Sequence, residues 1–270
     1  SVAGRPLSTR WLAEAEGGFD EALADGLRRD RWLQIAALPD GHAVAPYHDR
    51  LAEAVRAGMS AERRRALHGR LADLLAPQPD AEPEAVAVHF ERAGREAEAA
   101  RFVTRAADRA SSALAWDRAV RLYRRALELP GGERRRLQIA LGDALAGAGR
   151  GAEAADVYRL AGRGAEGELS LELERRVADQ LLRAGHLDAG FRALDAVLRS
   201  IGMELQRSPR AAIASLLWHR AHLELRGLGF EPREAPACDP AALREIDVLF
   251  SAGIGLSFEI GRASCRERVY

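Results

Sequence analysis

The sequence predicts an all-α fold with one small β-hairpin, in which helical hairpins stack into a solenoid behind a small N-terminal domain. Three observations predict it. Ala, Leu, Arg and Glu, which are strong helix formers, dominate the 270 residues. Beyond residue 83, apolar residues recur at helical spacing in one segment after another. Short turns that contain Gly or Pro separate these segments.

Residues 1–76 carry a different pattern from the rest. Two short amphipathic segments come first, and two β-capable stretches then flank an Asp40-Gly41 turn, which predicts a hairpin. Two helices follow, the second with Ser60 as its cap. Helices followed by a small hairpin are typical of a winged helix. The expected elements are helices over Leu7–Ala15 and Phe19–Arg29, strands over Trp32–Ile35 and Ala43–Tyr47, and helices over Asp49–Ala57 and Ala61–Leu75.

Two linkers rich in Pro and acidic residues, Pro77–Pro83 and Phe230–Pro240, divide the remaining chain. The predicted domains are a winged-helix end over residues 1–76, helical repeats over 84–229 and the start of a further repeat over 240–258. Helices are expected at 84–93, 96–113, 116–129, 133–148, 151–161, 169–184, 187–201, 209–226 and 240–257.

A short signature recurs at the turns between helices. It reads Gly94-Arg95 with Glu98-Ala99, then Gly149-Arg150 with Glu153-Ala154, and more loosely Gly185-His186 with Gly190. The spacing around the middle copy resembles a tetratricopeptide (TPR) repeat, whose helical hairpins stack and bind other proteins. The residues expected to pack between the helices are Leu141, Gly142, Leu145, Ala154, Tyr158, Ala161, Ala119, Tyr123 and Ala126.

The repeat spacing is regular except at its start. Ala119, Ala154 and Gly190 stand 35 and 36 residues apart, near the TPR period. Ala99 and Ala119 are only 20 residues apart, so the helix over 96–113 is expected to belong to two pairs at once. Paired helices are expected to cross closely where Ala or Gly faces Ala or Gly, with a larger side chain in the adjoining hole.

Composition excludes several kinds of site. The 40 basic and 40 acidic side chains balance, so no net charge favours nucleic acid or a membrane. The chain contains no lysine, which excludes a P-loop lysine, a kinase lysine and a Schiff base. The 2 cysteines, Cys238 and Cys265, make neither a disulfide framework nor a zinc site. No apolar run reaches the roughly 18 residues of a membrane span, and a cytoplasmic location is expected.

Both ends of the sequence predict a fragment of a longer protein. The chain begins at Ser1 without an initiator Met. Residues 260–269 read as the translation of ATC GGA AGA GCG TCG TGT AGG GAA AGA GTG, which resembles a short-read sequencing adapter. We expect residues 259–270 to be an adapter artefact and the natural protein to continue past about Phe258. A natural basic tail is the alternative.

Several stretches resemble parts of large bacterial STAND-type ATPase regulators of the AAA class. Val2–Leu7 resembles the beginning of the winged-helix part of the ATPase module, and Pro46–Val55 with Glu62–His68 resembles its end. Ala87–Ala99 and Trp116–Leu129 resemble the helices that follow this module.

One further stretch, Phe250–Ser257, is similar to a segment of PknK-like serine/threonine protein kinases. In those proteins a kinase domain precedes a STAND ATPase and TPR-like repeats. The resemblance implies that ATP or ADP acts as a switch in the parent protein, and that the repeats bind a protein partner in signal transduction. It also implies that the repeats act on an upstream ATPase module in cis.

No catalytic residue and no cofactor are expected within these residues. The P-loop, the kinase Gly-rich loop, H-R-D and D-F-G motifs are absent from the sequence. Two alternatives stay open. The parent is a LuxR-like ATP-dependent transcription activator with a DNA-binding domain downstream, or the chain is a plain TPR scaffold without a working ATPase.

The candidate nucleotide-sensing residues are His48 and Asp49. Tyr47-His48-Asp49 resembles the Met-His-Asp motif of related STAND proteins, with Tyr47 in place of Met. The resemblance implies that His48 faces the β-phosphate of the nucleotide, where a helix N-terminus adds a favourable dipole. The structural alternative is that Asp49 caps the helix.

Other conspicuous residues favour structural interpretations. His219 and His222 share a helix face but lack further ligands, so no metal site is expected. Trp116 and Trp218 are expected to pack. Acidic residues among Phe19–Arg31 argue against a nucleic-acid surface on the winged helix.

Two arginine runs and a glycine pair complete these candidates. Arg124–Arg125 and Arg134–Arg136 are expected to be solvated helix faces, with an anion-binding strip as the alternative. Gly253-Ile254-Gly255 is too short for a dinucleotide fingerprint. We expect it to let two helices approach each other.

Overall fold

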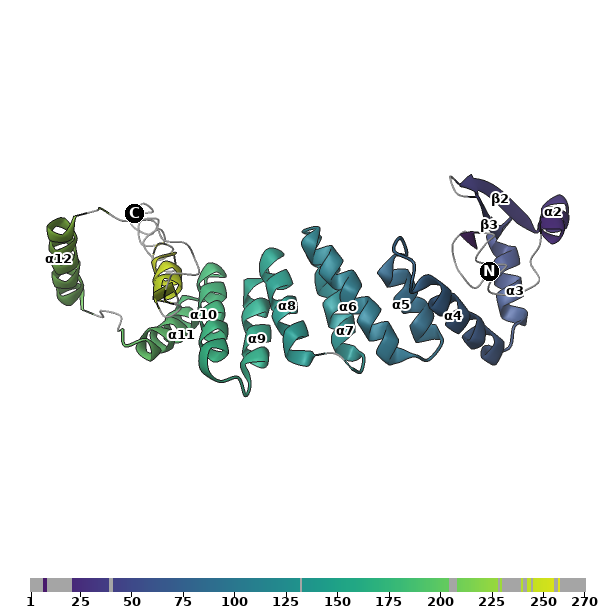
Figure 1. Cartoon of the computed structure of the whole chain (residues 1–270). Coiled ribbons are helices and arrows are strands. Elements are labelled where there is room, and N and C mark those ends of the chain that lie inside the picture. Colours follow the sequence, from purple (N-terminus) through teal and green to yellow (C-terminus); the bar gives the residue numbers. More distant parts are fainter. Residues whose placement is uncertain are drawn as a thin grey trace, which may run out of the picture. The chain divides into compact units, whose positions relative to one another are not determined.

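The computed structural model describes residues 7–8, 21–38, 41–131, 133–203, 208–227, 229, 239, 242–243, 245–254 and 257. These residues are mostly helical, as the sequence predicts, and include one three-stranded antiparallel sheet (Figure 1). The chain divides into two compact units, Ser1–Leu137 and Gln138–Tyr270. The division falls inside α8 (Arg134–Gly147). The predicted domain boundaries at the two linkers stay predictions.

The sheet belongs to the first unit and has the strand order β1-β3-β2. The predicted hairpin is formed by β2 (Leu33–Leu38) and β3 (Gly41–Pro46). Leu38 pairs with Gly41, so Gly41 belongs to β3 and the expected Asp-Gly turn is wrong at that residue. The two residues that connect the strands lie outside the described residues.

The helix expected over Leu7–Ala15 is wrong at its start. Leu7 and Ser8 form β1 and pair with Val44 and Ala43 at the open edge of β3. A short amphipathic segment does not hold a helix without packing, and the edge of β3 offers its backbone hydrogen bonds instead. Residues 9–15 of this prediction lie outside the described residues.

Three helices follow the predicted order around the hairpin: α2 (Glu21–Arg29), α3 (Asp49–Gly58) and α4 (Ala61–Leu75). The Ser60 hydroxyl accepts from the Arg63 N–H at 3.1 Å, which confirms Ser60 as the cap of α4. His48 holds the cap position of α3 with extended backbone, so the expectation that Asp49 caps this helix is wrong.

The first unit continues with α5 (Pro83–Arg92), α6 (Glu96–Ser112) and α7 (Trp116–Glu128). Each packs against the helix before it, from α4 onward (Figure 1). The helix α6 therefore contacts both α5 and α7, as its short repeat spacing predicts. The core between α4, α5 and α6 is built from Ala72, Leu75, Val86, Phe90 and Ala99.

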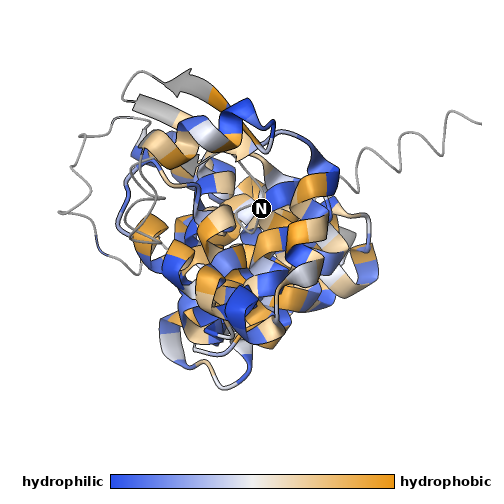
Figure 2. Cartoon of the chain, turned by 90° about the vertical axis from the view of Figure 1, so that its right-hand side faces the viewer, coloured by the Kyte–Doolittle hydropathy of each residue, from blue (hydrophilic) through white to orange (hydrophobic). Residues whose placement is uncertain are grey.

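The second unit contains the rest of α8, then α9 (Gly151–Gly162), α10 (Gly167–Arg183) and α11 (Leu187–Ser200). The helix α10 packs against both α9 and α11. Helical residues 245–254 follow later in the chain. Hydrophobic and hydrophilic residues mix along the individual helices (Figure 2), because each helix buries only one face. The core of this unit is formed by Ala178, Leu182, Leu194, Val197, Leu198, Val248 and Ala252.

Two expectations about the end of the chain are wrong. Trp218 lies on α12 (Pro209–Arg226) with 71% of its surface exposed, so it does not pack within the described residues. The apolar residues of α12 point in several directions, and the described elements bury none of the large ones. Gly253 is exposed, and a Cβ there would meet nothing within 4 Å, so it marks no close helix approach, while Gly255 of the same prediction lies outside the described residues.

Candidate functional site

Four turns between helices share one geometry. They connect α5 to α6, α6 to α7, α8 to α9 and α10 to α11. In each turn one residue has a left-handed φ. The backbone N–H of the residue after it donates a hydrogen bond to the carbonyl five residues before that donor, as in a Schellman motif. The left-handed residues are Gly94 (76°), Leu114 (56°), Gly149 (74°) and Gly185 (81°). The bonds of 2.8–2.9 Å run from Arg95 to Phe90, Ala115 to Ala110, Arg150 to Leu145 and His186 to Leu181.

This geometry accounts for the recurring Gly-Arg signature. Glycine adopts the left-handed φ without steric cost. The arginine that follows precedes a new helix and pairs with the glutamate three residues on. The Nε of Arg95 donates to Glu98 at 2.8 Å, and that of Arg150 donates to Glu153 at 2.8 Å. The equivalent turn at Leu114 falls at the predicted break between the helices over 96–113 and 116–129, but it carries no glycine and therefore lacks the signature.

All nine residues expected to pack between helices are buried. The close contacts differ from the expected facing of small residues. A Cβ on Gly142 would lie 2.5 Å from Cε1 of Tyr158, and a Cβ on Gly190 would lie 2.7 Å from the Leu182 side chain. Each glycine thus faces a large side chain, because the ring or the leucine fills the space that a Cβ would take.

The same tyrosine–aspartate bond occurs in two helical hairpins. The Tyr123 hydroxyl donates to Asp108 at 2.8 Å, and the Tyr158 hydroxyl donates to Asp143 at 2.6 Å, across 15 residues in both cases. Burial, followed by the hydrogen bond to the carboxylate, raises the pKa of both phenols. Both therefore stay protonated donors at neutral pH. The repeated Asp–Tyr separation was present in the sequence as a signal.

Of the arginines that were expected to form solvated faces, Arg124 and Arg134–Arg136 are exposed, as expected, and Arg125 is half-buried. Two of the five also connect neighbouring helices. Arg136 donates to Asp108 at 3.1 Å, and Arg125 pairs with Glu91 of α5. These guanidinium groups are already occupied by carboxylates. The alternative of an anion-binding strip is therefore wrong at Arg125 and Arg136.

The structure places His48 and Asp49 together at the exposed start of α3. The His48 side chain makes no capping hydrogen bond, and its ring meets Tyr47 edge-on with 4.7 Å between the ring centroids. Both side chains are accessible from solvent at a helix N-terminus. Their role in nucleotide sensing stays a prediction.

A buried histidine pair joins α4 to α5 and was not anticipated from the sequence. The Nδ1 atoms of His68 and His89 are 2.8 Å apart, so one ring donates and the other accepts. Both rings are buried. Burial, with the positive charges of Arg92 and Arg64, lowers the pKa of His68. His68 is therefore held uncharged at neutral pH.

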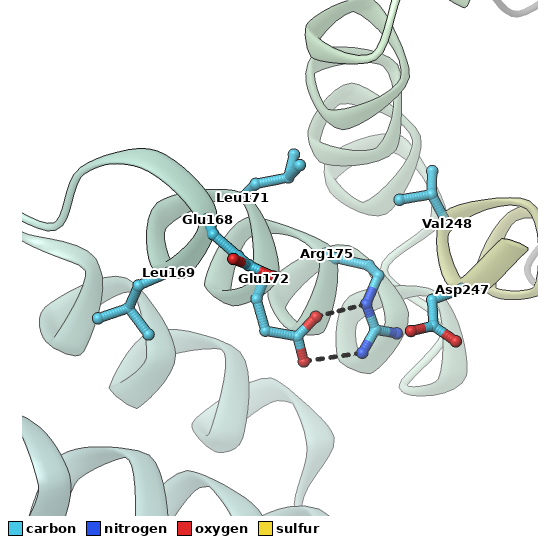
Figure 3. A pocket seen from close by; sticks show the side chains of 7 residues that line it. All are labelled: Glu168, Leu169, Leu171, Glu172, Arg175, Asp247 and Val248. Carbon is cyan, nitrogen blue, oxygen red and sulfur yellow. Dashed lines mark hydrogen bonds and ion pairs between the residues drawn. The ribbon is translucent and has the colours of Figure 1, made fainter. Parts of the chain in front are cut away.

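A pocket of about 480 Å³ lies in the second unit between α10 and residues 245–254 (Figure 3). Arg175 stands between Glu172 and Asp247. Its guanidinium donates to both Glu172 oxygens at 2.8 and 2.9 Å and to the Ser251 hydroxyl at 2.8 Å. Burial alone would raise the pKa of Glu172, but hydrogen bonds from Arg175 and Arg176 lower it. Arg175 thus acts as a structural bridge.

The rest of this pocket is partly apolar. Leu169, Leu171 and Val248 form its apolar lining, and Glu168 lies beside them (Figure 3). None of the lining residues is a nucleophile with a base next to it.

Metal and membrane features are absent from the described part of the chain. Within it, no group of three or more His, Cys, Asp or Glu side chains is placed to hold a metal ion. His219 and His222 lie exposed on α12. Across the same residues, every helix is too short or too polar to cross a membrane. Comparison with known protein families and with curated proteins found no match for this chain.

Proposed function

We propose that this chain is the regulatory protein-interaction segment of a bacterial signal-transduction ATPase. In this proposal, TPR-like repeats bind a protein partner and follow the winged-helix end of an ATPase module. The observation that supports it is repetition. One turn geometry recurs at four turns between helices and again after α2 and α11, and one tyrosine–aspartate bond recurs at the same separation. Stacked helical hairpins of this kind present extended surfaces that suit protein partners.

The N-terminal elements support the second half of the proposal. The small antiparallel sheet with α2 and α3 is compatible with a winged helix. His48 is exposed at the N-terminus of α3. The free backbone N–H groups of the first helical turn and the helix dipole favour a phosphate at this position. ATP or ADP would bind in the parent protein, a cytoplasmic regulator, and partner binding on the repeats would change its nucleotide state.

The flanking coding sequence is the first test. A nucleotide-binding loop upstream supports an ATPase regulator, and a kinase domain before it supports the PknK-like form. A helix-turn-helix domain downstream would favour the LuxR-like form. Absence of any nucleotide-binding loop in the complete gene would contradict the ATPase part and leave a scaffold.

The second test measures nucleotide exchange in the parent protein. His48→Ala is expected to change the release rate of ADP, because the imidazole would lose its contact with the phosphate. His219→Ala, an exposed histidine on α12, serves as the matched control. Equal exchange rates in both variants and in the unsubstituted protein would contradict the sensing role of His48.

The third test addresses the partner directly. A photoreactive benzoylphenylalanine replaces Leu169 in the pocket of Figure 3, and Glu128 at the end of α7 as an exposed control. A discrete adduct with another protein in living cells, formed at Leu169 and not at Glu128, is expected. Equal background labelling at both positions would contradict a partner site in this pocket.

A further inference from the structure

A second groove, of about 620 Å³, lies in the first unit where α4 ends beside α6. Ala76 and Pro77 line one side of it, and Arg101, Phe102 and Arg105 line the other. Arg105 lies three positions after Phe102 and four after Arg101, so it is a neighbour of both on the helix surface. The groove is therefore apolar at its base and basic along one edge.

The base of the groove is built by stacked rings. The rings of Phe90 and Phe102 are 5.3 Å apart at their centroids, and the Arg95 guanidinium lies 4.7 Å from the Phe90 centroid. Arg95 is fixed by two carboxylates, Asp73 at 2.6 Å and Glu98 at 2.8 Å. The two acidic side chains of the groove are thus engaged by a single internal arginine.

Arg101 and Arg105 differ from those arginines of the first unit that pair with carboxylates. Both are exposed, and neither forms an ion pair with any described residue. By contrast, Arg118 and Arg125 of α7 pair with carboxylates of α5. Asp73 and Glu98 are engaged by Arg95, and the charge of Arg101 acts on Glu98 only from a distance. The edge of the groove therefore keeps two guanidinium groups without an ion pair to any described residue.

We propose that this groove binds a protein segment in which carboxylates flank an apolar side chain. The proposal rests on the proposed protein-interaction function and names the chemistry of the partner. The apolar side chain would lie against Phe102 and Pro77. The carboxylates would accept hydrogen bonds from Arg101 and Arg105, whose planar guanidinium groups match a carboxylate in shape. A strongly basic segment would meet two like charges.

The test uses the whole chain and a phage-displayed library of random dodecapeptides. Enriched peptides are expected to carry Asp or Glu next to Leu, Ile or Phe. Fluorescence anisotropy then measures the affinity of the enriched peptides. The double variant Arg101→Glu/Arg105→Glu is expected to bind them at least about tenfold more weakly, because it loses charge-assisted hydrogen bonds. Both substituted positions are exposed, so the double variant is expected to keep its fold, which a circular dichroism spectrum like that of the unsubstituted chain would show.

The matched control makes the same change in net charge at two positions outside the groove. Arg134 and Arg192 are exposed and form no ion pair with any described residue, so Arg134→Glu/Arg192→Glu is expected to keep the affinity within about twofold. Binding that weakens equally in both double variants would overturn the groove as the site. Enrichment of basic peptides, or tighter binding of single-stranded DNA that depends on Arg101 and Arg105, would also overturn it.

The outcomes separate this inference from the proposed function. Peptides that bind the parent and both double variants equally would overturn the groove but leave a protein-interaction function. Failure of every display selection, together with absence of any crosslink at Leu169, would contradict both.

Discussion

The hydroxyl of Tyr158 donates a 2.6 Å hydrogen bond to Asp143 on the preceding helix, and the same ring occupies the space where Gly142 lacks a side chain. One side chain therefore fixes both the apolar contact and the polar edge of the α8–α9 hairpin. Tyr123 and Asp108 form the same bond in the α6–α7 hairpin. Both hairpins thus join their two helices through the same kind of hydrogen bond.

Removing the phenol oxygen should destabilise each hairpin. Tyr158→Phe keeps the ring over Gly142 but loses the bond to Asp143, at a cost of about 1 kcal/mol in the free energy of unfolding. Tyr123→Phe should behave alike. Tyr47→Phe is the control, because Tyr47 is exposed and its ring contact with His48 survives. Urea unfolding that gives equal stabilities for all three variants would contradict the structural role of the Tyr–Asp pairs.

Substitutions at two helical glycines, Gly142 and Gly69, test the contact between Gly142 and the Tyr158 ring. Gly142→Ala places a Cβ 2.5 Å from the Tyr158 ring, and overpacking of this kind costs about 1–3 kcal/mol. Gly69→Ala, also inside a helix, meets only the Ala93 Cβ at 3.8 Å, so it should gain up to about 1 kcal/mol of helix propensity. Thermal unfolding should therefore shift in opposite directions for the two variants. A stabilising Gly142→Ala would contradict the packing of Tyr158 on α8.

The packing of small residues between helices extends this argument to Ala154. It is fully buried, so Ala154→Leu should cost about 1–3 kcal/mol through overpacking. A thermal melt without loss of stability would count against its place between α8 and α9. Ala97→Leu, at an exposed position of α6, is the control and should change little.

The four equivalent turns allow an exchange of residue types. Gly149 has a φ of 74°, so Gly149→Ala should cost about 1 kcal/mol. Leu114 holds the same left-handed position with φ 56° and is exposed. Leu114→Gly should relieve that strain and stabilise the α6–α7 hairpin by up to about 1 kcal/mol. Destabilisation by Leu114→Gly would show that the leucine side chain contributes more than its backbone strain costs.

Helix positions could be predicted from sequence because apolar period and turn residues agree along the repeats. The predicted range 209–226 matches α12, and Ala61–Leu75 matches α4. The strand at Leu7–Ser8 could not be predicted, because it depends on an edge of β3 that only the folded chain offers. The break between the helices over 96–113 and 116–129 was predicted, but the left-handed conformation of Leu114 was not, because no glycine marks it.

The candidate sites also include features that could be predicted from the sequence and features that could not. Burial of the repeat residues follows from their spacing. The His68–His89 contact, the Arg175 bridge and the groove at Arg101 each depend on which faces meet when distant helices pack. A single sequence with 40 arginines gives no means to separate those that pair from those that do not.

The His68–His89 pair predicts a pH dependence of stability. The pKa of His68 is lowered in the folded chain by burial, Arg92 and Arg64, whereas the unfolded chain binds a proton near the ordinary value of about 6.5. The pair's contribution is therefore fully present above about pH 6.5 and is lost as the pH falls below it. A single histidine gives a slope of at most about 1.4 kcal/mol per pH unit.

Urea unfolding between about pH 7.5 and pH 5.5 isolates this effect, because carboxylates with a lowered pKa, such as Glu84 and Glu172, titrate below that range. The parent should lose stability across the range. His68→Leu/His89→Leu should flatten the slope, since apolar groups of similar size replace both partners of the bond. His219→Gln on α12 should keep the parent's slope. An unchanged slope in the double variant would mean that the buried pair accepts a proton as easily as the unfolded chain, and its contact between α4 and α5 would then not respond to pH.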